Sequence, residues 1–282
     1  MRPLKIKKET ITLLNNDSIR TQLDLDIHHL VVFGDSMSDN GFENGHGFQR
    51  YSNGKVWAEY LAKKMDLTTL DVRAWGGATS GKGNYRSNAR DWSGLLWQTE
   101  QYTPATNMDN TLVVVEIGYN DLHDPDINIS AIQVMENVIE GLKQLFSKGV
   151  KHILLWNLNT TLVFPGYTDK NYQSFNYYQN KNETAQSTFK EYNQLINLAI
   201  HELNQKYQTI TIDLFDANLA INEISKKFEN ITTPWIETGK YPKIGQWFWF
   251  DHWHYMTEAH SKIADYLYKY LSPTNNSFHN KP

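Results

Sequence analysis

Residues 30–41 read Leu-Val-Val-Phe-Gly-Asp-Ser-Met-Ser-Asp-Asn-Gly, an apolar run that ends in a turn carrying a serine. Four consecutive apolar residues before a glycine predict a short strand buried on both faces, as in a parallel sheet covered by helices. Gly34 and Gly41 supply the backbone angles of the turn, which leaves Ser36 at the carboxyl end of the strand. Open α/β sheets bind ligands at that edge, so Ser36 is a candidate nucleophile. From this segment alone, a serine that only caps the next helix is the alternative interpretation.

Short apolar runs and amphipathic segments alternate along the rest of the chain. Further strands are expected over 70–74, 111–117, 151–158 and 209–214, and helices over 56–65, 130–147, 184–207, 218–228 and 257–271. Each crossover between parallel strands returns right-handed over the sheet, so helices should cover both faces. The expected fold class is therefore α/β, with a five-stranded parallel sheet between two helical layers.

The chain has 282 residues, of which 40% are apolar, enough for one sizeable core and one domain over 28–272. Residues 1–27 are expected to form an N-terminal extension with a hairpin near 15–17, and 273–282 a polar tail. The stretches 160–182 and 229–250 are rich in aromatic residues and are predicted to be loop insertions. The first is either a lid over the cleft or a surface decoration.

Composition excludes several classes of function. The net charge is −4 and no run is rich in Lys or Arg, which disfavours a nucleic-acid partner. The chain has no cysteine, so disulfides, Cys-ligated zinc and thiol nucleophiles are ruled out. No apolar run approaches the roughly 20 residues that span a bilayer, and no apolar stretch follows the basic start as a secretion signal would require. A soluble protein is expected. The sequence leaves open the cellular compartment, whether a signal sequence has been removed, and the oligomeric state.

Three turns that follow predicted strands carry the groups needed for ester cleavage. Ser36, Gly77 and Asn120 should meet at one edge, because the carboxyl ends of parallel strands lie together. Ser36 offers a hydroxyl nucleophile, and its N–H, the Gly77 N–H and the Asn120 amide offer three donors to an oxyanion. Taken alone, Asn120-Asp121 is equally an ordinary helix cap. Residues 124–126, Asp-Pro-Asp, are interpreted as a solvated loop and not as an acid–base pair.

Residues 251–254, Asp-His-Trp-His, provide the candidate base. A carboxylate three residues before a histidine on one tight turn reaches its Nδ1 and leaves Nε2 for the serine, so Asp251 pairs better with His254 than with His252. His260 lies on another side of a predicted helix and is interpreted as a packing residue. His-x-His is also a metal-site pattern. No second ligand cluster accompanies it and a serine mechanism needs no metal, so neither a metal nor a cofactor is predicted.

Four blocks of the chain resemble, in order, the signature blocks of the GDSL (SGNH) hydrolases. They are Gly-Asp-Ser-Met-Ser-Asp-Asn-Gly at 34–41, Trp-Gly-Gly-Ala-Thr at 75–79, Gly-Tyr-Asn-Asp at 118–121 and Asp-His-Trp-His at 251–254. The resemblance spans nearly the whole predicted domain and implies the family's flavodoxin-like α/β/α sandwich, the SGNH hydrolase fold. It implies an ester hydrolase with the nucleophile Ser36, the oxyanion donors Gly77 and Asn120, the base His254 and its partner Asp251.

Within this family the chain looks most like the bacterial phospholipase, lysophospholipase and acyltransferase branch, which includes the thermolabile haemolysins. The spacing from Asp251 to His254, with the later Ala259-His260, carries this finer resemblance. It implies a lipid acyl ester as substrate, in keeping with aromatic residues over 164–178 and 247–250. It also implies acyl transfer to an alcohol as a further activity, and transient contact with a membrane surface. A short-chain or carbohydrate ester is the alternative substrate. An inactive binding module is the alternative class, although all five expected residues are present.

The sequence departs from the family pattern at three places. Met37 stands where leucine is usual, and Val72 where asparagine often precedes the second block. Tyr255 and Met256 replace the common proline and threonine after the histidine, which could displace the histidine loop. None of these changes touches a catalytic atom. The Gly-x-Ser-x-Gly elbow of α/β-hydrolases is missing, which favours the GDSL family over that fold.

Overall fold

The structure is a computed structural model that describes residues 26–87, 89–104 and 108–272. Five parallel strands form one sheet in the order β2-β1-β3-β4-β5. Their bounds are β1 His29–Gly34, β2 Thr69–Val72, β3 Thr111–Glu116, β4 His152–Trp156 and β5 Thr211–Phe215. The expected hairpin near 15–17 and the polar tail 273–282 lie outside the described residues.

The strand order changes direction beside β1, which pairs with β2 on one side and with β3 on the other. The chain runs from β1 to β2 and then returns across β1 to β3. Such a switch point leaves a crevice beyond the carboxyl ends of the two central strands, where α/β proteins bind ligands. All six residues of β3 are buried, as expected for a central strand covered on both faces.

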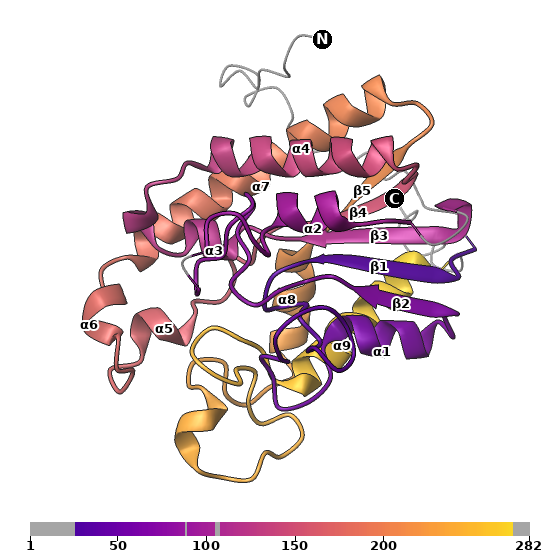
Figure 1. Cartoon of the computed structure of the whole chain (residues 1–282). Coiled ribbons are helices and arrows are strands. Elements are labelled where there is room, and N and C mark those ends of the chain that lie inside the picture. The colour runs from indigo at the N-terminus through magenta and orange to yellow at the C-terminus, as the bar shows by residue number, and fades with distance from the viewer. Residues whose placement is uncertain (1–25, 88, 105–107, 273–282) are drawn as a thin grey trace, which may run out of the picture.

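Helices cover both faces of the sheet, so the predicted three-layer α/β/α fold is confirmed (Figure 1). On one face α4 packs against α2 and α7, and on the other α9 packs against α1 and α8. The helices are α1 Trp57–Lys64, α2 Leu95–Gln101, α3 Tyr119–Leu122, α4 Ala131–Ser147, α5 Pro165–Thr168, α6 Phe175–Tyr178, α7 Asn182–Lys206, α8 Ala217–Ser225 and α9 Thr257–Leu271. Short 3-10 turns cover Met108–Asn110, Pro125–Ile127 and Trp235–Thr238.

Local sequence signals set the ends of α4. The Ser130 hydroxyl accepts the Gln133 N–H and the Gln133 side chain accepts the Ser130 N–H, each at 3.2 Å, so a capping box begins the helix. Gly149 follows the last turn with a φ of 86°, a left-handed conformation that glycine adopts without strain. Between these ends Val134, Val138 and Leu142 are buried on one stripe, which packs the helix into the hydrophobic core.

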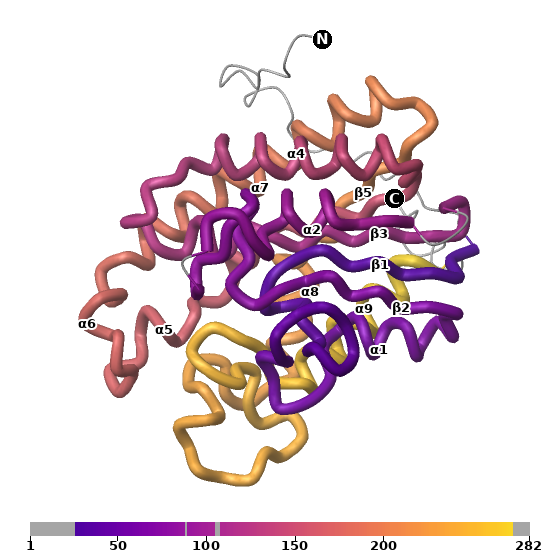
Figure 2. The backbone as a smooth tube through the Cα atoms, viewed as in Figure 1, coloured from indigo at the N-terminus to yellow at the C-terminus, as the bar shows by residue number. Residues whose placement is uncertain are grey.

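The two aromatic-rich insertions lie beyond the carboxyl ends of the strands, near one another (Figure 2). The segment 160–182 contains the short helices α5 and α6, and 229–250 contains the turn Trp235–Thr238. The Gly166 N–H donates to the His252 carbonyl at 3.0 Å, so the first insertion is joined to the segment that follows the second. Both insertions therefore border the crevice at the switch point.

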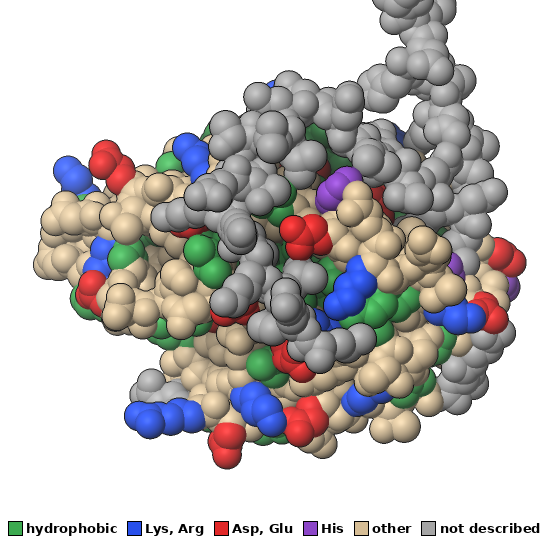
Figure 3. Space-filling view, turned by 90° about the horizontal axis from the view of Figure 1, so that it is seen from above, with side chains coloured by type: hydrophobic (Ala, Val, Ile, Leu, Met, Phe, Trp, Pro, Cys, Tyr) green, Lys and Arg blue, Asp and Glu red, His purple; other side chains and the backbone are tan. Residues whose placement is uncertain are grey.

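On the face shown in Figure 3, acidic and basic side chains are interspersed, without a field of one sign. This distribution agrees with the net charge of −4. Among the described residues, none of the helices is both long enough and apolar enough to span a bilayer.

Candidate active site

Ser36 lies directly after β1, in a turn that its neighbour Asp35 holds together. The Asp35 carboxylate accepts the Met37 N–H at 3.0 Å, and the Asp35 carbonyl accepts the N–H groups of Ser38 at 3.1 Å and Asp39 at 3.0 Å. Ser36 is 9% exposed. Its hydroxyl is therefore presented at a fixed place at the carboxyl end of the strand, as the sequence predicts.

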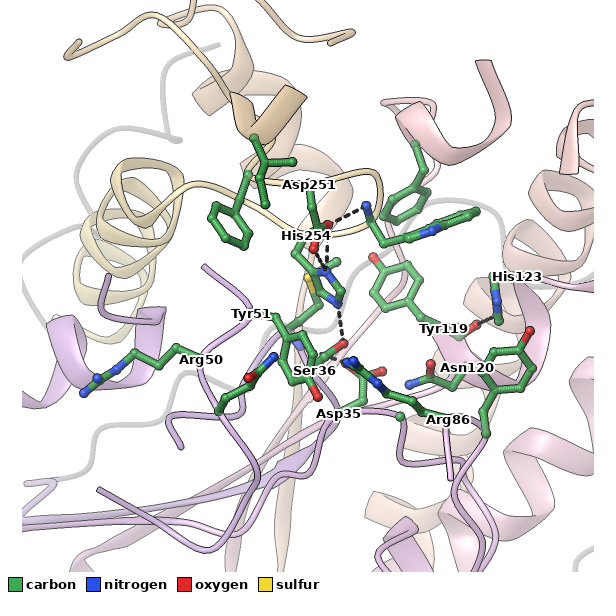
Figure 4. A pocket seen from close by; sticks show the side chains of 18 of the residues that line it. Asp35, Ser36, Arg50, Tyr51, Arg86, Tyr119, Asn120, His123, Asp251 and His254 are labelled. Atoms are coloured by element: carbon green, nitrogen blue, oxygen red, sulfur yellow. Dashed lines mark hydrogen bonds and ion pairs between the residues drawn. The ribbon is translucent and has the colours of Figure 1, made fainter. Parts of the chain in front are cut away.

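His254 stands between Ser36 and Asp251 (Figure 4). Its Nε2 is 2.8 Å from the Ser36 Oγ, and its Nδ1 is 2.8 Å and 2.9 Å from the two Asp251 carboxylate oxygens. This is the arrangement in which a histidine withdraws the proton of a serine hydroxyl while a carboxylate fixes its tautomer. Tyr255 and Met256, which depart from the family pattern, do not displace the histidine loop.

The Asp251 carboxylate also accepts the N–H groups of Trp253 and His254, both at 2.8 Å. Burial acts to raise the pKa of Asp251, but the charge of His254 and these hydrogen bonds hold it below its usual value. The Tyr51 ring packs against the His254 imidazole, with ring centroids 4.9 Å apart. His254 is thus oriented by a charge on one side and by an aromatic ring on another.

Gly77 and Asn120 line the same cavity as Ser36. The Asn120 Nδ2 donates one N–H to the Ala78 carbonyl at 3.0 Å, and its second N–H is left for another acceptor. Gly77 has a φ of 82°, and a Cβ at this position would lie 2.6 Å from the Asn84 Oδ1. Only glycine fits here, which lets the backbone approach a ligand closely. The three predicted oxyanion donors are thus brought together.

A group of buried acids lies beneath the site, and the sequence interpretation missed it. Asp35, Glu116 and Asp121 are at most 3% exposed. Glu116 accepts the Ser38 hydroxyl at 3.0 Å, and Asp121 accepts the Ser80 N–H and hydroxyl, both at 2.8 Å. Burial raises the pKa of Glu116 and of Asp121 to about 7, and burial together with the nearby Glu116 raises that of Asp35. The sequence did contain one sign of this group: Glu116 is a charged residue within the otherwise apolar strand predicted over 111–117.

The cavity over Ser36 has a volume of about 650 Å³ and a largely aromatic wall. The wall includes Tyr85, Tyr119, Phe164, Tyr172, Tyr178, Phe250 and Trp253. The segment 160–182 therefore forms part of the wall. The segment 247–250 contributes less: Trp247, Phe248 and Trp249 are at most 5% exposed in the protein interior, and only Phe250 lines the cavity.

The other two candidate histidines do not contact Ser36. The His252 Nε2 is 3.2 Å from an Asp169 carboxylate oxygen, and its ring stacks on Tyr172 with centroids 4.0 Å apart. His260 is 1% exposed within α9, and burial lowers its pKa to about 3, as for a neutral packing residue. Within 26–87, 89–104 and 108–272, no three His, Asp or Glu side chains are grouped to hold a metal ion.

The interpretation of residues 124–126 as a solvated loop is wrong at Asp124. Its side chain is 4% exposed and accepts the Lys181 ammonium and the Tyr177 hydroxyl, both at 2.8 Å. Burial acts to raise the pKa of Asp124, but these two hydrogen bonds hold it below its usual value. Lys181 also bonds Asp126 at 2.7 Å, so the ammonium ties the end of the insertion 160–182 to the loop after α3.

The chain is similar to a known family and to known proteins. A family model described as GDSL-like Lipase/Acylhydrolase matches residues 30–267. The thermolabile hemolysin of Vibrio parahaemolyticus is 29% identical over 159 residues, which cover 50% of this chain and 36% of that protein. The phosphatidylcholine-sterol acyltransferase of Aeromonas hydrophila is 27% identical over 146 residues, which cover 46% of this chain and 44% of that protein. The alignments thus span less than half the length of either relative.

Among solved structures, the inhibitor-bound aryl esterase of M. smegmatis superposes on the chain with a TM-score of 0.54. The superposition covers 86% of this chain and 96% of the esterase, at 14% identity. At that identity the likeness shows the fold alone.

Proposed function

The chain belongs to the GDSL-like lipase/acylhydrolase family, and from this premise we propose that it hydrolyses carboxylic esters through an acyl-enzyme. One observation carries the proposal: the Ser36 hydroxyl, the His254 imidazole and the Asp251 carboxylate are joined by contacts of 2.8 Å at the edge of a ligand-sized cavity. A serine becomes a useful nucleophile when a neighbouring base takes its proton, and this chain of contacts supports that role.

In the proposed first step the Ser36 Oγ attacks the ester carbonyl carbon while its proton passes to the His254 Nε2. The N–H groups of Ser36 and Gly77 and the Asn120 amide stabilise the oxyanion. The tetrahedral intermediate collapses, His254 returns the proton to the departing alcohol, and the acyl group stays on the serine. Water then attacks the acyl-enzyme by the same route. Asp251 holds the imidazole tautomer and stabilises the imidazolium.

For the substrate we propose a lipid-like acyl ester. The aromatic wall of the 650 Å³ cavity supports an apolar acyl chain, since such walls bury apolar ligands. The names of the two relatives, a hemolysin and a phosphatidylcholine-sterol acyltransferase, support the same class and keep acyl transfer to an alcohol as a second outcome of the acyl-enzyme. An added alcohol that lowers the yield of free acid and appears as a new ester distinguishes transfer from hydrolysis.

The insertion 229–250 supports transient contact with a lipid surface. Tyr241 is 94% exposed and Ile244 93% exposed, while Ile236 of the same insertion lines the cavity. Two large apolar side chains fully in water on one insertion are the feature that supports contact with another apolar phase.

The experiment compares wild type and Ser36→Ala on a p-nitrophenyl ester series of increasing acyl length and on a lysophospholipid. We expect kcat/KM of the variant to fall by about 10⁴-fold or more, because removing a triad serine removes the acyl-enzyme route. Ser147→Ala, an exposed serine in the last turn of α4, is the matched control and should keep full activity. The acyl length with the highest kcat/KM tests the lipid assignment against a short-chain ester.

Unchanged hydrolysis in Ser36→Ala would remove this serine as nucleophile. A folded wild type that cleaves none of the esters would instead favour the inactive binding module. Both outcomes need a folded variant, so each sample is first checked by thermal unfolding.

A further inference from the structure

The cavity above Ser36 contains one charge that the structure does not balance. Its charged lining residues are Asp35, Arg50, Arg86 and Asp251. Arg50 is bound by both oxygens of Glu59, at 2.6 Å and 2.9 Å. Asp251 is bound to His254, and Asp35 is fully buried beneath the turn of the nucleophile. Arg86 is left as the charged lining residue without an opposite charge beside it.

No carboxylate of the described residues lies within 4.0 Å of the Arg86 guanidinium. Its neighbour is Tyr51: the guanidinium lies over the ring, 5.3 Å from its centroid, and also interacts with the Tyr51 hydroxyl, which is a neutral partner, and Tyr51 itself packs on His254. Figure 4 shows the Arg86 side chain reaching toward Ser36 from the side of Asn120. His123, which also lines the cavity, is neutral at physiological pH because burial lowers its pKa to about 4. It does not add to the positive charge.

The backbone of Arg86 is built into the same unit as the proposed oxyanion donors. The buried Asn84 side chain accepts the N–H groups of Arg86 at 2.9 Å and Ser87 at 3.0 Å, and it donates to the Gly76 carbonyl at 2.9 Å. A Cβ on Gly77 would lie 2.8 Å from the Arg86 Cβ. The root of the arginine side chain is thus fixed against Gly77, while the residue as a whole is exposed and lines the cavity.

We infer that Arg86 binds an anionic oxygen group, a phosphate or a carboxylate, carried by the ester substrate next to its scissile bond. The inference rests on the proposed ester hydrolysis and adds a determinant of specificity to it. A guanidinium forms two parallel hydrogen bonds to such groups, which fixes the substrate as well as attracting it. With Arg50 already bound to Glu59, the substrate anion supplies the counter-charge of Arg86.

Two other roles would explain the position of Arg86. It could stabilise the oxyanion of every ester, or it could serve only to pack on Tyr51. Both predict that substrates with and without a negative charge are affected alike. The inferred role predicts a difference between them, so the ratio of kcat/KM for charged and neutral esters is the decisive quantity.

The test uses three esters with one acyl chain: a neutral monoacylglycerol, the corresponding monoacylglycerol phosphate and a monoacylated glycerate. We expect wild type to prefer one or both charged esters, and Arg86→Gln to lower that preference by about 10- to 100-fold, mainly through KM, as for the loss of hydrogen bonds to a charged group. Arg86→Lys should keep part of it. The phosphate and carboxylate arms show which anion the site takes.

Arg90→Gln is the matched control, since Arg90 is exposed and belongs to the same loop. It should leave the preference unchanged. An equal loss on all three esters in Arg86→Gln would overturn the inference in favour of a role at the oxyanion. A wild type without preference for a charged ester would also overturn it. Failure of the proposed function itself is distinguishable, because Ser36→Ala would then retain hydrolysis of the neutral ester.

Discussion

At the scale of single residues, the Asn120 amide has two tasks. One N–H of its Nδ2 is used on the Ala78 carbonyl at 3.0 Å, which aims the amide, and the other is available to the cavity. An amide held in this way is oriented before the substrate arrives, and such preorganised donors act mainly on the transition state. The alternative of an ordinary helix cap does not hold, because Asn120 lies inside α3 and Gly118 is the N-cap. The prediction that follows separates the role at the oxyanion from a purely structural bond to Ala78.

Asn120→Ala should lower kcat by about 10²–10³-fold with little change in KM, because the donor acts on charge that develops during the reaction. The free energy of unfolding should fall by only about 1 kcal/mol, the contribution of one hydrogen bond. Steady-state kinetics and urea unfolding measure the two effects. Asn197→Ala, which removes a 2.9 Å amide bond to the Asn193 carbonyl on α7, is the control. Equal kcat in both variants would leave Asn120 only its structural bond to Ala78.

The grouping of Ser36, His254 and Asp251 could be predicted from the sequence because each lies in a short turn whose spacing fixes its geometry. Their catalytic roles stay predictions. Asp124 could not be read in this way, since Asp-Pro-Asp is typical of a solvated turn. The partners that bury it, Tyr177 and Lys181, follow 53 and 57 residues later, so no local pattern connects them. That Arg86 has no carboxylate beside it among the described residues can likewise be seen only in the structure, which shows where the neighbouring carboxylates lie.

At the scale of elements, the connection between the insertion 160–182 and the loop after α3 depends on one ammonium group. Lys181 is 14% exposed and binds both Asp124 and Asp126. Its ammonium also lies over the Tyr177 ring, 3.2 Å from the centroid. Tyr178, the neighbouring residue, lines the cavity, so loosening this connection should loosen the cavity wall.

Lys181→Met should increase the rate of proteolytic cleavage within 160–182 and raise KM several-fold, because it leaves the buried Asp124 carboxylate without its counter-charge. Limited proteolysis and kinetics measure both effects. Lys170→Met, at an exposed position of the same insertion, should change neither. Adding Asp124→Asn to Lys181→Met removes the unpaired charge and should restore part of the resistance. If the single variant matches wild type, the ammonium does not hold the wall.

Long periodic segments were predicted well at this scale, with all five strands and the long helices found within a few residues of their expected ends. The helix α2 was missed, since its buried Gln98 and Thr99 interrupt the apolar stripe that marks a helix. Gln98 is buried because its side chain bonds both the N–H and the carbonyl of Gly34. The helices α5 and α6 have four residues each, too few for a period to be visible.

At the scale of the whole molecule, the buried acids couple folding to pH. In the unfolded chain Glu116 and Asp121 would ionise near their ordinary pKa values of 4.5 and 3.8, whereas in the folded protein burial raises both to about 7. Between these values the folded state binds more protons than the unfolded state. Stability from these two groups is therefore fully present below about pH 4 and is lost as the pH rises through 7. The pKa values of Asp251 and Asp124 are lowered in the folded protein, so these two groups stabilise it above their ordinary pKa, and this stability is lost as the pH falls into the acidic range.

Glu116→Gln should make the protein more stable than wild type at pH 8, with a difference that shrinks toward pH 5. The amide has nearly the shape of the protonated carboxyl: its oxygen can accept the Ser38 hydroxyl, and its N–H₂ can donate to the Asp35 carboxyl, with which Glu116 interacts. Urea unfolding at several pH values measures the effect. Glu140→Gln, an exposed position on α4, should leave the pH dependence unchanged. Parallel curves for wild type and Glu116→Gln would mean that Glu116 is already ionised in the folded protein, because an ionised carboxylate would release no proton over this range.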